Sequence, residues 1–110
     1  MSSGDPAGTY LSAECRVRDD TAVVVVKGEI DWHASAVLEA ALDDALRSGA
    51  RRIDVDFAGV RFCDCSGITE LLSARRRARA RGMTFRLVHV PKPIMRLLKA
   101  TDTARFLDAT

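Results

Sequence analysis

The sequence predicts one α/β domain with a small mixed four-stranded sheet, flanked by helices in the order β-β-α-β-α-β-α-α. Its length of 110 residues suits a single domain. Four short segments carry alternating or continuous apolar residues, which is typical of strands, and other segments space apolar residues at helical intervals. From residue 21 onward strand and helix segments alternate, and such a series implies parallel strands joined by right-handed crossovers.

The first two strands are expected to form a hairpin. Residues 10–19 partly alternate, Asp19 and Asp20 form a turn, and residues 21–30 contain four consecutive valines. An unbroken β-branched run is typical of a strand that is covered on both faces, so the second strand is predicted to be central. Residues 1–9 are small and polar, and we expect them to form a flexible tail that precedes a domain spanning residues 10–110.

The middle of the chain predicts helix, strand and helix. Residues 37–46, beginning with Val37, place their apolar side chains on one helical stripe, and Ser48-Gly49 ends that helix because glycine accepts a left-handed backbone. Residues 51–60 alternate and predict the third strand. Residues 68–82 predict a second amphipathic helix that stops at its final glycine.

The last part of the chain predicts a strand, a helix and a final turn. Residues 84–90 are predicted to form a strand with His89 on the same face as Phe85 and Leu87. Pro93 is suited to the first position of a third helix. One more short helical turn is expected near the end, with Phe106 and Leu107 closing the core.

Composition excludes several classes of function. The net charge of +2 does not demand a nucleic-acid or membrane partner, and the start of the chain lacks the pattern of a signal peptide, so we expect a cytoplasmic protein. The cysteines are odd in number, which argues against a disulfide framework. Cys63 and Cys65 form a single C-x-C pair, and His33 and His89 lie at no zinc-ligand spacing from it, so we expect no metal and no cofactor.

The segment Asp64-Cys65-Ser66-Gly67 lies where the third strand meets the second helix, and it allows three interpretations. A catalytic nucleophile is disfavoured because the glycines of a hydrolase elbow are missing, so we predict no enzyme activity. A helix cap made by Ser66 or Asp64 is favoured by residue chemistry, although Glu70 follows Ser66 by four residues instead of the three of a capping box.

The third interpretation is a charge switch at Ser66. A phosphoserine carries roughly −1.5 to −2 charges at neutral pH, and a helix N-terminus accepts such a charge. The fold would therefore persist, and the strong effect would fall on a partner that covers this surface. Stranding a charge in an interface typically costs ~2–5 kcal/mol, which is ~30-fold to several-thousand-fold in affinity.

The second helix is rich in arginine, which raises nucleic-acid binding as a rival. Its arginines are Arg75, Arg76, Arg77, Arg79 and Arg81. Successive positions point around a helix and do not share one face, and aromatic residues that could stack on bases make up only 5% of the chain. We therefore favour a solvated helix face and expect no direct binding of nucleic acid.

Three segments of the chain resemble the STAS domain, the fold of bacterial anti-sigma factor antagonists and of the cytoplasmic tails of sulfate transporters. Gly28-Glu29-Ile30-Asp31 resembles the family's G-E-[LI]-D motif. Residues 55–82 follow its pattern of apolar strand, D-[ST]-[ST]-G and arginine-rich helix. Residues 86–107 are similar to its closing strand, proline turn and final helices.

The resemblance implies a partner-switching regulator. In that family the serine before the glycine, here Ser66, is phosphorylated by an anti-sigma factor with a histidine-kinase-like ATPase fold, and a serine phosphatase reverses the modification. The unphosphorylated antagonist binds the anti-sigma factor and releases the sigma factor for transcription. The alternative is a STAS scaffold that does not switch, or a subunit of a transporter complex.

The resemblance also implies a partner surface. It would comprise Asp31, Trp32, His33, Asp64, Cys65, Ser66 and Gly67. Asp31 would lie beside the phosphorylation loop or cap the helix that follows, and Asp64 would orient the loop or cap the second helix. This sequence departs from the family at Cys65, where a hydroxyl residue is usual, at Asp102, where a glycine is often found, and at the bulky pair Trp32-His33.

Overall fold

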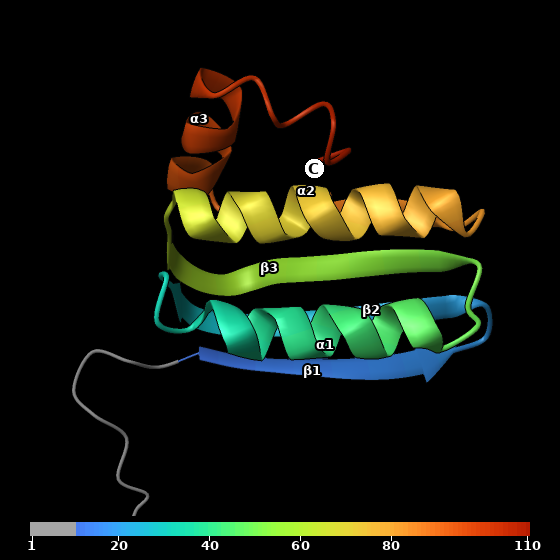
Figure 1. Cartoon of the computed structure of the whole chain (residues 1–110). Coiled ribbons are helices and arrows are strands. Elements are labelled where there is room, and N and C mark those ends of the chain that lie inside the picture. The colour runs from blue at the N-terminus through green and yellow to red at the C-terminus, as the bar shows by residue number, and fades with distance from the viewer. Residues whose placement is uncertain (1–10) are drawn as a thin grey trace, which may run out of the picture.

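The structure, a computed structural model, describes residues 11–110, so the tail predicted over residues 1–9 and its boundary with the domain lie outside the described residues. The strands are β1 (Leu11–Arg18), β2 (Thr21–Ile30), β3 (Arg52–Cys63) and β4 (Thr84–Val88), and the helices are α1 (Ser35–Arg47), α2 (Cys65–Ala80) and α3 (Lys92–Ala100). They form one sheet in the order β1-β2-β3-β4 (Figure 1). β1 is antiparallel to β2, and the remaining pairs are parallel, which confirms the predicted mixed α/β fold.

The two faces of the sheet differ, and this corrects one prediction. α1 and α2 lie side by side over the same face (Figure 1). On β2, Val24 and Val26 are fully buried on that face, whereas Val23 and Val25 alternate with them and are only half-buried. The prediction that β2 is covered on both faces by the fold was therefore wrong: the valine run serves one packed face and one partly open face.

β3 extends to Cys63, beyond the predicted residue 60, and its pairing with β2 is irregular. The register between the two strands shifts between Val25 and Lys27 and again between Gly28 and Glu29. Gly28 adopts a φ of 110°, which favours glycine. The burial period changes after these irregularities, and β3 continues to Cys63.

The segment from β4 to the C-terminus also departs from the predictions. His89 has a φ of 56° and lies beyond the end of β4, so its predicted place within the strand was wrong. The final segment forms turns and not a fourth helix, although Leu107 donates a helix-like hydrogen bond to the Thr103 carbonyl at 3.1 Å. Leu107 is fully buried as expected, but Phe106 is 45% exposed and does not close the core.

The outer edge of β4 is covered by the end of the chain. The Leu87 N–H donates to the carbonyl of Leu107 at 3.0 Å, and the Thr110 N–H donates to the carbonyl of Leu87 at 2.9 Å. These bonds satisfy strand groups that would otherwise need water. α3 begins at Lys92, directly after Pro91. Pro93 therefore occupies the second helical position, whereas the prediction placed it at the first.

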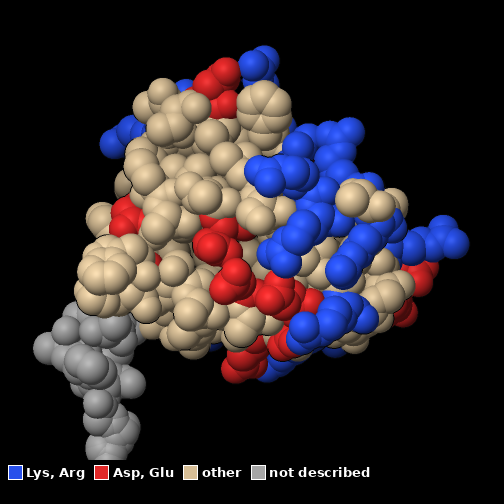
Figure 2. Space-filling view, viewed as in Figure 1, with Lys and Arg blue, Asp and Glu red and all other residues tan. Residues whose placement is uncertain are grey.

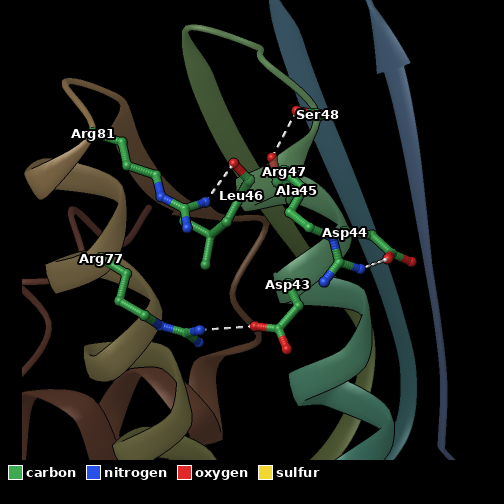
Figure 3. Close-up of polar contacts among 8 residues, drawn as sticks. All are labelled: Asp43, Asp44, Ala45, Leu46, Arg47, Ser48, Arg77 and Arg81. Carbon is green, nitrogen blue, oxygen red and sulfur yellow. Dashed lines mark hydrogen bonds and ion pairs between the residues drawn. The ribbon is translucent and has the colours of Figure 1, made fainter.

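α1 and α2 are held together by apolar packing and by two arginines (Figure 3). Arg77 donates to the Asp43 carboxylate at 2.8 Å, and Arg81 donates to the carbonyl of Leu46 at 2.8 Å. Val37 was expected on the buried stripe of α1 but is 43% exposed. The predicted end of α1 is confirmed, since Gly49 follows it with a φ of 80°. No helix within residues 11–110 is long and apolar enough to cross a membrane.

Candidate functional site

The candidate site lies where two neighbouring parallel strands end. β2 ends at Ile30 and β3 at Cys63, and these residues are register partners, so the loops that follow them emerge at the same edge of the sheet. The Asp64 N–H donates to the Ile30 carbonyl at 3.0 Å and joins the two loops. The Asp31 loop and the Asp64-to-Gly67 segment, distant in sequence, therefore meet as expected.

Asp64 is the N-cap of α2. Its Oδ1 atom accepts hydrogen bonds from the Ser66 N–H at 2.9 Å and from the Gly67 N–H at 3.3 Å. Its extended backbone, with φ −99° and ψ −173°, is the usual conformation of a capping residue. Of the two capping candidates in the sequence, the structure thus selects Asp64 and leaves the Ser66 side chain for another role.

The Ser66 hydroxyl is bound by the same carboxylate. Ser66 Oγ donates to Asp64 Oδ1 at 2.5 Å, and the side chain is half-buried. This hydrogen bond is the main reason why the pKa of Asp64 is lowered. Burial is the next influence and raises the pKa, and the backbone N–H groups of Gly67, Ser66 and Trp32 each lower it further. A carboxylate stabilised in its charged form is a poor general base, which argues against a catalytic serine.

Gly67 is required by packing. A Cβ at this position would lie 2.7 Å from Cys63 Sγ and 2.7 Å from Ile30 Cγ2, closer than real side chains approach. The first turn of α2 thus lies directly on the ends of β2 and β3. This close contact fixes the position of Ser66, the residue immediately before the glycine.

The loop after β2 carries exposed aromatic residues. Asp31 Oδ1 accepts a hydrogen bond from the Ala34 N–H at 3.0 Å, which closes a turn before α1. Trp32 is 68% exposed, and its ring lies against His33 with 3.7 Å between the ring centroids. Asp31 therefore acts as a cap for this turn, while Trp32 and His33 present an exposed pair of rings beside the Asp64 loop.

The two cysteines of the C-x-C pair have different environments. Cys65 is exposed at the first position of α2. Cys63 is buried, and burial together with the nearby Asp64 and Cys65 raises its pKa to about 12. Cys63 is therefore a packing residue, whereas Cys65 belongs to the accessible surface around Ser66.

Phe62 is a surface residue that the sequence reasoning missed. It lies in the extension of β3 as the register partner of Glu29 and is 50% exposed. Its position two residues before the polar segment is the signal in the sequence, but the alternating pattern itself ends before residue 62. Within residues 11–110 there is no cluster of three or more residues that could hold a metal ion.

Comparisons with known proteins identify the family. The family model described as "Mlab, STAS domain" matches residues 14–108. An anti-sigma factor antagonist from Mycobacterium paratuberculosis is similar in structure, with a TM-score of 0.83, 20% identity, and coverage of 91% of this chain and 85% of that one.

Two further solved structures share the fold. The phosphorylated form of the Bacillus cell fate determinant SpoIIAA has a TM-score of 0.68 and 20% identity, with 92% and 91% of the two chains covered. A sulfate transporter family protein from Wolinella succinogenes has a TM-score of 0.71 and 16% identity, with 84% and 75% covered. The capped junction at Asp64 thus lies in a known architecture, and the chain belongs to the STAS domain family.

Proposed function

We propose that this protein is a cytoplasmic bacterial anti-sigma factor antagonist that is switched off by phosphorylation of Ser66. The observation that carries the proposal is the Ser66 hydroxyl, held by Asp64 at the N-terminus of α2 and half-exposed beside a surface of exposed rings. Unmodified protein binds an anti-sigma factor with a histidine-kinase-like ATPase fold and so frees the sigma factor. The protein acts by binding and not as an enzyme.

The chemistry of the modification explains the switch. Transfer of the γ-phosphoryl group of ATP forms an Oγ–P bond at Ser66 and releases ADP and the hydroxyl proton. The hydrogen bond from Ser66 Oγ to Asp64 is then lost, because its proton has gone. A phosphate of roughly −2 charge stands beside a carboxylate whose pKa is already low, so both groups remain charged.

The fold is expected to tolerate this charge. Asp64 already accepts from the N–H groups of Ser66 and Gly67, so it is the dipole of α2 that favours an anion at this position. The cost falls on any protein docked over Trp32, Phe62 and Cys65, whose exposed surfaces supply the apolar part of the contact. A charge stranded there is expected to weaken binding by ~30-fold to several-thousand-fold.

The test is incubation of the protein with a cognate anti-sigma kinase and ATP, followed by mass spectrometry and measurement of affinity. We expect modification at Ser66 and loss of the complex with the anti-sigma factor. Treatment with a serine phosphatase is expected to restore binding. Ser66→Ala is expected to bind with or without ATP, and Ser66→Asp to bind partially because aspartate carries less charge than phosphate.

Thr69 provides a matched control on the same helix. It is exposed one turn further along, where its hydroxyl donates to the carbonyl of Cys65 at 2.9 Å. Thr69→Ala is expected to change neither modification nor binding. Modification at Thr69, or equal affinity of Ser66→Asp and the unmodified protein, would contradict the proposal.

A scaffold that does not switch is the second candidate. The Ser66 hydroxyl is already satisfied by Asp64, as a purely structural residue would be, and the sulfate transporter family protein shares this fold. This alternative predicts no modification at Ser66 and co-purification with a transporter ATPase in place of a sigma-regulating kinase.

A further inference from the structure

The arginines of α2 serve two different purposes. Arg77 and Arg81 reach α1, where Asp43 and the carbonyl of Leu46 accept their hydrogen bonds. Arg75 and Arg79 lie on another side of the helix, one turn apart, and line a cleft. Only the first pair is explained by packing between the helices.

The cleft is a concave space of about 380 Å³ between the C-terminal half of α2, the start of β4 and the C-terminal segment. Its lining combines guanidinium groups from Arg75, Arg79 and Arg105 with the carboxylate of Asp108 and the ring of Phe106. The lining holds three cations and one anion, and the charge of Arg105 is also paired with Asp102 beside the cleft, so the net charge there is positive by about one. Figure 2 shows basic side chains gathered over this half of α2.

Phe106 explains how the guanidinium groups are held. The guanidinium carbon of Arg75 lies 5.7 Å from the centre of the Phe106 ring, and that of Arg105 lies 5.2 Å from it. Arg105 also donates one N–H to the Asp102 carboxylate at 3.0 Å. An arginine held against an aromatic ring keeps its remaining N–H donors available for another acceptor. This arrangement gives a reason for the exposure of Phe106, which the core does not use.

We propose that this cleft binds a small phosphorylated molecule. A phosphoryl group is an anion that the positive charge of the cleft attracts, and its oxygens accept hydrogen bonds from guanidinium groups on separate elements. The volume is within the range of small-molecule sites, so there is room for more than the phosphate. Asp108 favours a ligand whose remaining part carries a hydroxyl or amino donor.

This site is separate from the Ser66 loop. Arg75 and Arg79 follow Ser66 by nine and thirteen residues along α2, which corresponds to about 14 and 20 Å of helix. The inference therefore does not depend on the proposed partner switching. It assigns a second binding function to the opposite end of the same helix.

Inorganic pyrophosphate is a suitable probe, titrated into the whole protein by calorimetry, with sodium chloride at matched ionic strength as the control. We expect saturable binding, accompanied by shifts of the side-chain N–H signals of Arg75, Arg79 and Arg105 in NMR spectra. Arg75→Gln and Arg79→Gln are each expected to weaken binding by about tenfold. Phe106→Leu keeps the apolar bulk and is expected to weaken binding less.

Arg76→Gln is the matched control, because Arg76 is exposed on the same helix and does not line the cleft. It removes the same charge and is expected to change affinity by less than about twofold. Equal losses in Arg75→Gln and Arg76→Gln, or no saturable binding of pyrophosphate, would overturn the proposal. Tight binding of a single-stranded oligonucleotide without binding of pyrophosphate would overturn it in favour of a nucleic-acid surface.

Discussion

The loops that follow β2 and β3 are capped in the same way but present different side chains. In each loop an aspartate accepts a hydrogen bond from the backbone N–H three residues later, Asp31 from Ala34 and Asp64 from Gly67. The residue two positions after the aspartate is His33 in the first loop and Ser66 in the second. Asp64 therefore also binds a hydroxyl, whereas the Asp31 loop presents exposed rings.

The Asp64 loop therefore holds one chemical group, the Ser66 hydroxyl, in a fixed position, whereas the Asp31 loop offers a surface for contact. Ser66 is held by its hydrogen bond to Asp64 and by the close packing of the neighbouring Gly67. Trp32 is largely exposed and lies mainly against its neighbour His33. Substitutions in the two loops should consequently affect stability to different degrees.

The largest effect on stability is expected at Gly67. Gly67→Ala introduces a Cβ that collides with Cys63 and Ile30, and we expect it to lower the free energy of unfolding by about 1–3 kcal/mol, measured by urea denaturation. The equivalent position in the other loop is Ala34, which already carries a Cβ. Ala34→Gly is expected to cost less, about 0.5–1 kcal/mol. Equal costs would show that the two loops are packed alike.

The next effect compares the two caps. Asp64→Ala removes the acceptor of three hydrogen bonds and is expected to cost about 1–2 kcal/mol, whereas Asp31→Ala removes the acceptor of one and is expected to cost about 0.5–1 kcal/mol. Both values come from thermal or urea unfolding. Asp64→Asn retains an acceptor oxygen and should recover part of the loss. A larger cost at Asp31 than at Asp64 would contradict the expectation that the Asp64 cap contributes more to stability.

A smaller and more specific effect concerns the pKa of Asp64. The hydrogen bond from Ser66 is its main lowering influence, so Ser66→Ala should raise this pKa toward its ordinary value, as measured by NMR titration of the carboxyl carbon. Because the folded-state pKa is lowered, ionised Asp64 stabilises the fold above its ordinary pKa, and this contribution is lost as the pH falls through the folded value. An unchanged pKa in Ser66→Ala would mean that the backbone N–H groups dominate.

The smallest effect on stability is expected at Trp32. Its ring is mostly in solvent, so Trp32→Ala should change the free energy of unfolding by less than about 0.5 kcal/mol. The affinity for the anti-sigma factor should nevertheless fall by about tenfold or more, as is common for an exposed aromatic anchor. Calorimetric binding and urea unfolding of the same variant separate the two effects. A destabilised variant, or one that binds normally, would remove Trp32 from the contact surface.

Local chemistry made much of this fold predictable. The hairpin turn at Asp19, the valine-rich central strand and the glycine after α1 follow from turn propensity, β-branching and backbone freedom. The junction at Asp64 was predictable because a polar segment between apolar strand and helix needs a cap. The choice between Asp64 and Ser66 was not, since both residue types are good caps and only the backbone geometry distinguishes them.

The errors have long-range causes. Phe106 and Val37 read as core residues from their apolar character, yet the remaining helix and strand surfaces already fill the core without them. His89 continues an apparent alternation but adopts a left-handed backbone that ends β4. The cleft beside Phe106 was also hidden, because it joins Arg75 to Arg105 across thirty positions of sequence.

The two-residue turn between β1 and β2 has a consequence for the order of folding. It gives the central strand a partner from adjacent sequence, whereas β3 reaches β2 only after the whole crossover through α1. Closing a short loop costs less chain entropy than closing a long one, so the hairpin is expected to form before the parallel pairs. In pulsed hydrogen exchange during refolding, amide protons of β1 and β2 should therefore gain protection earlier than those of β4.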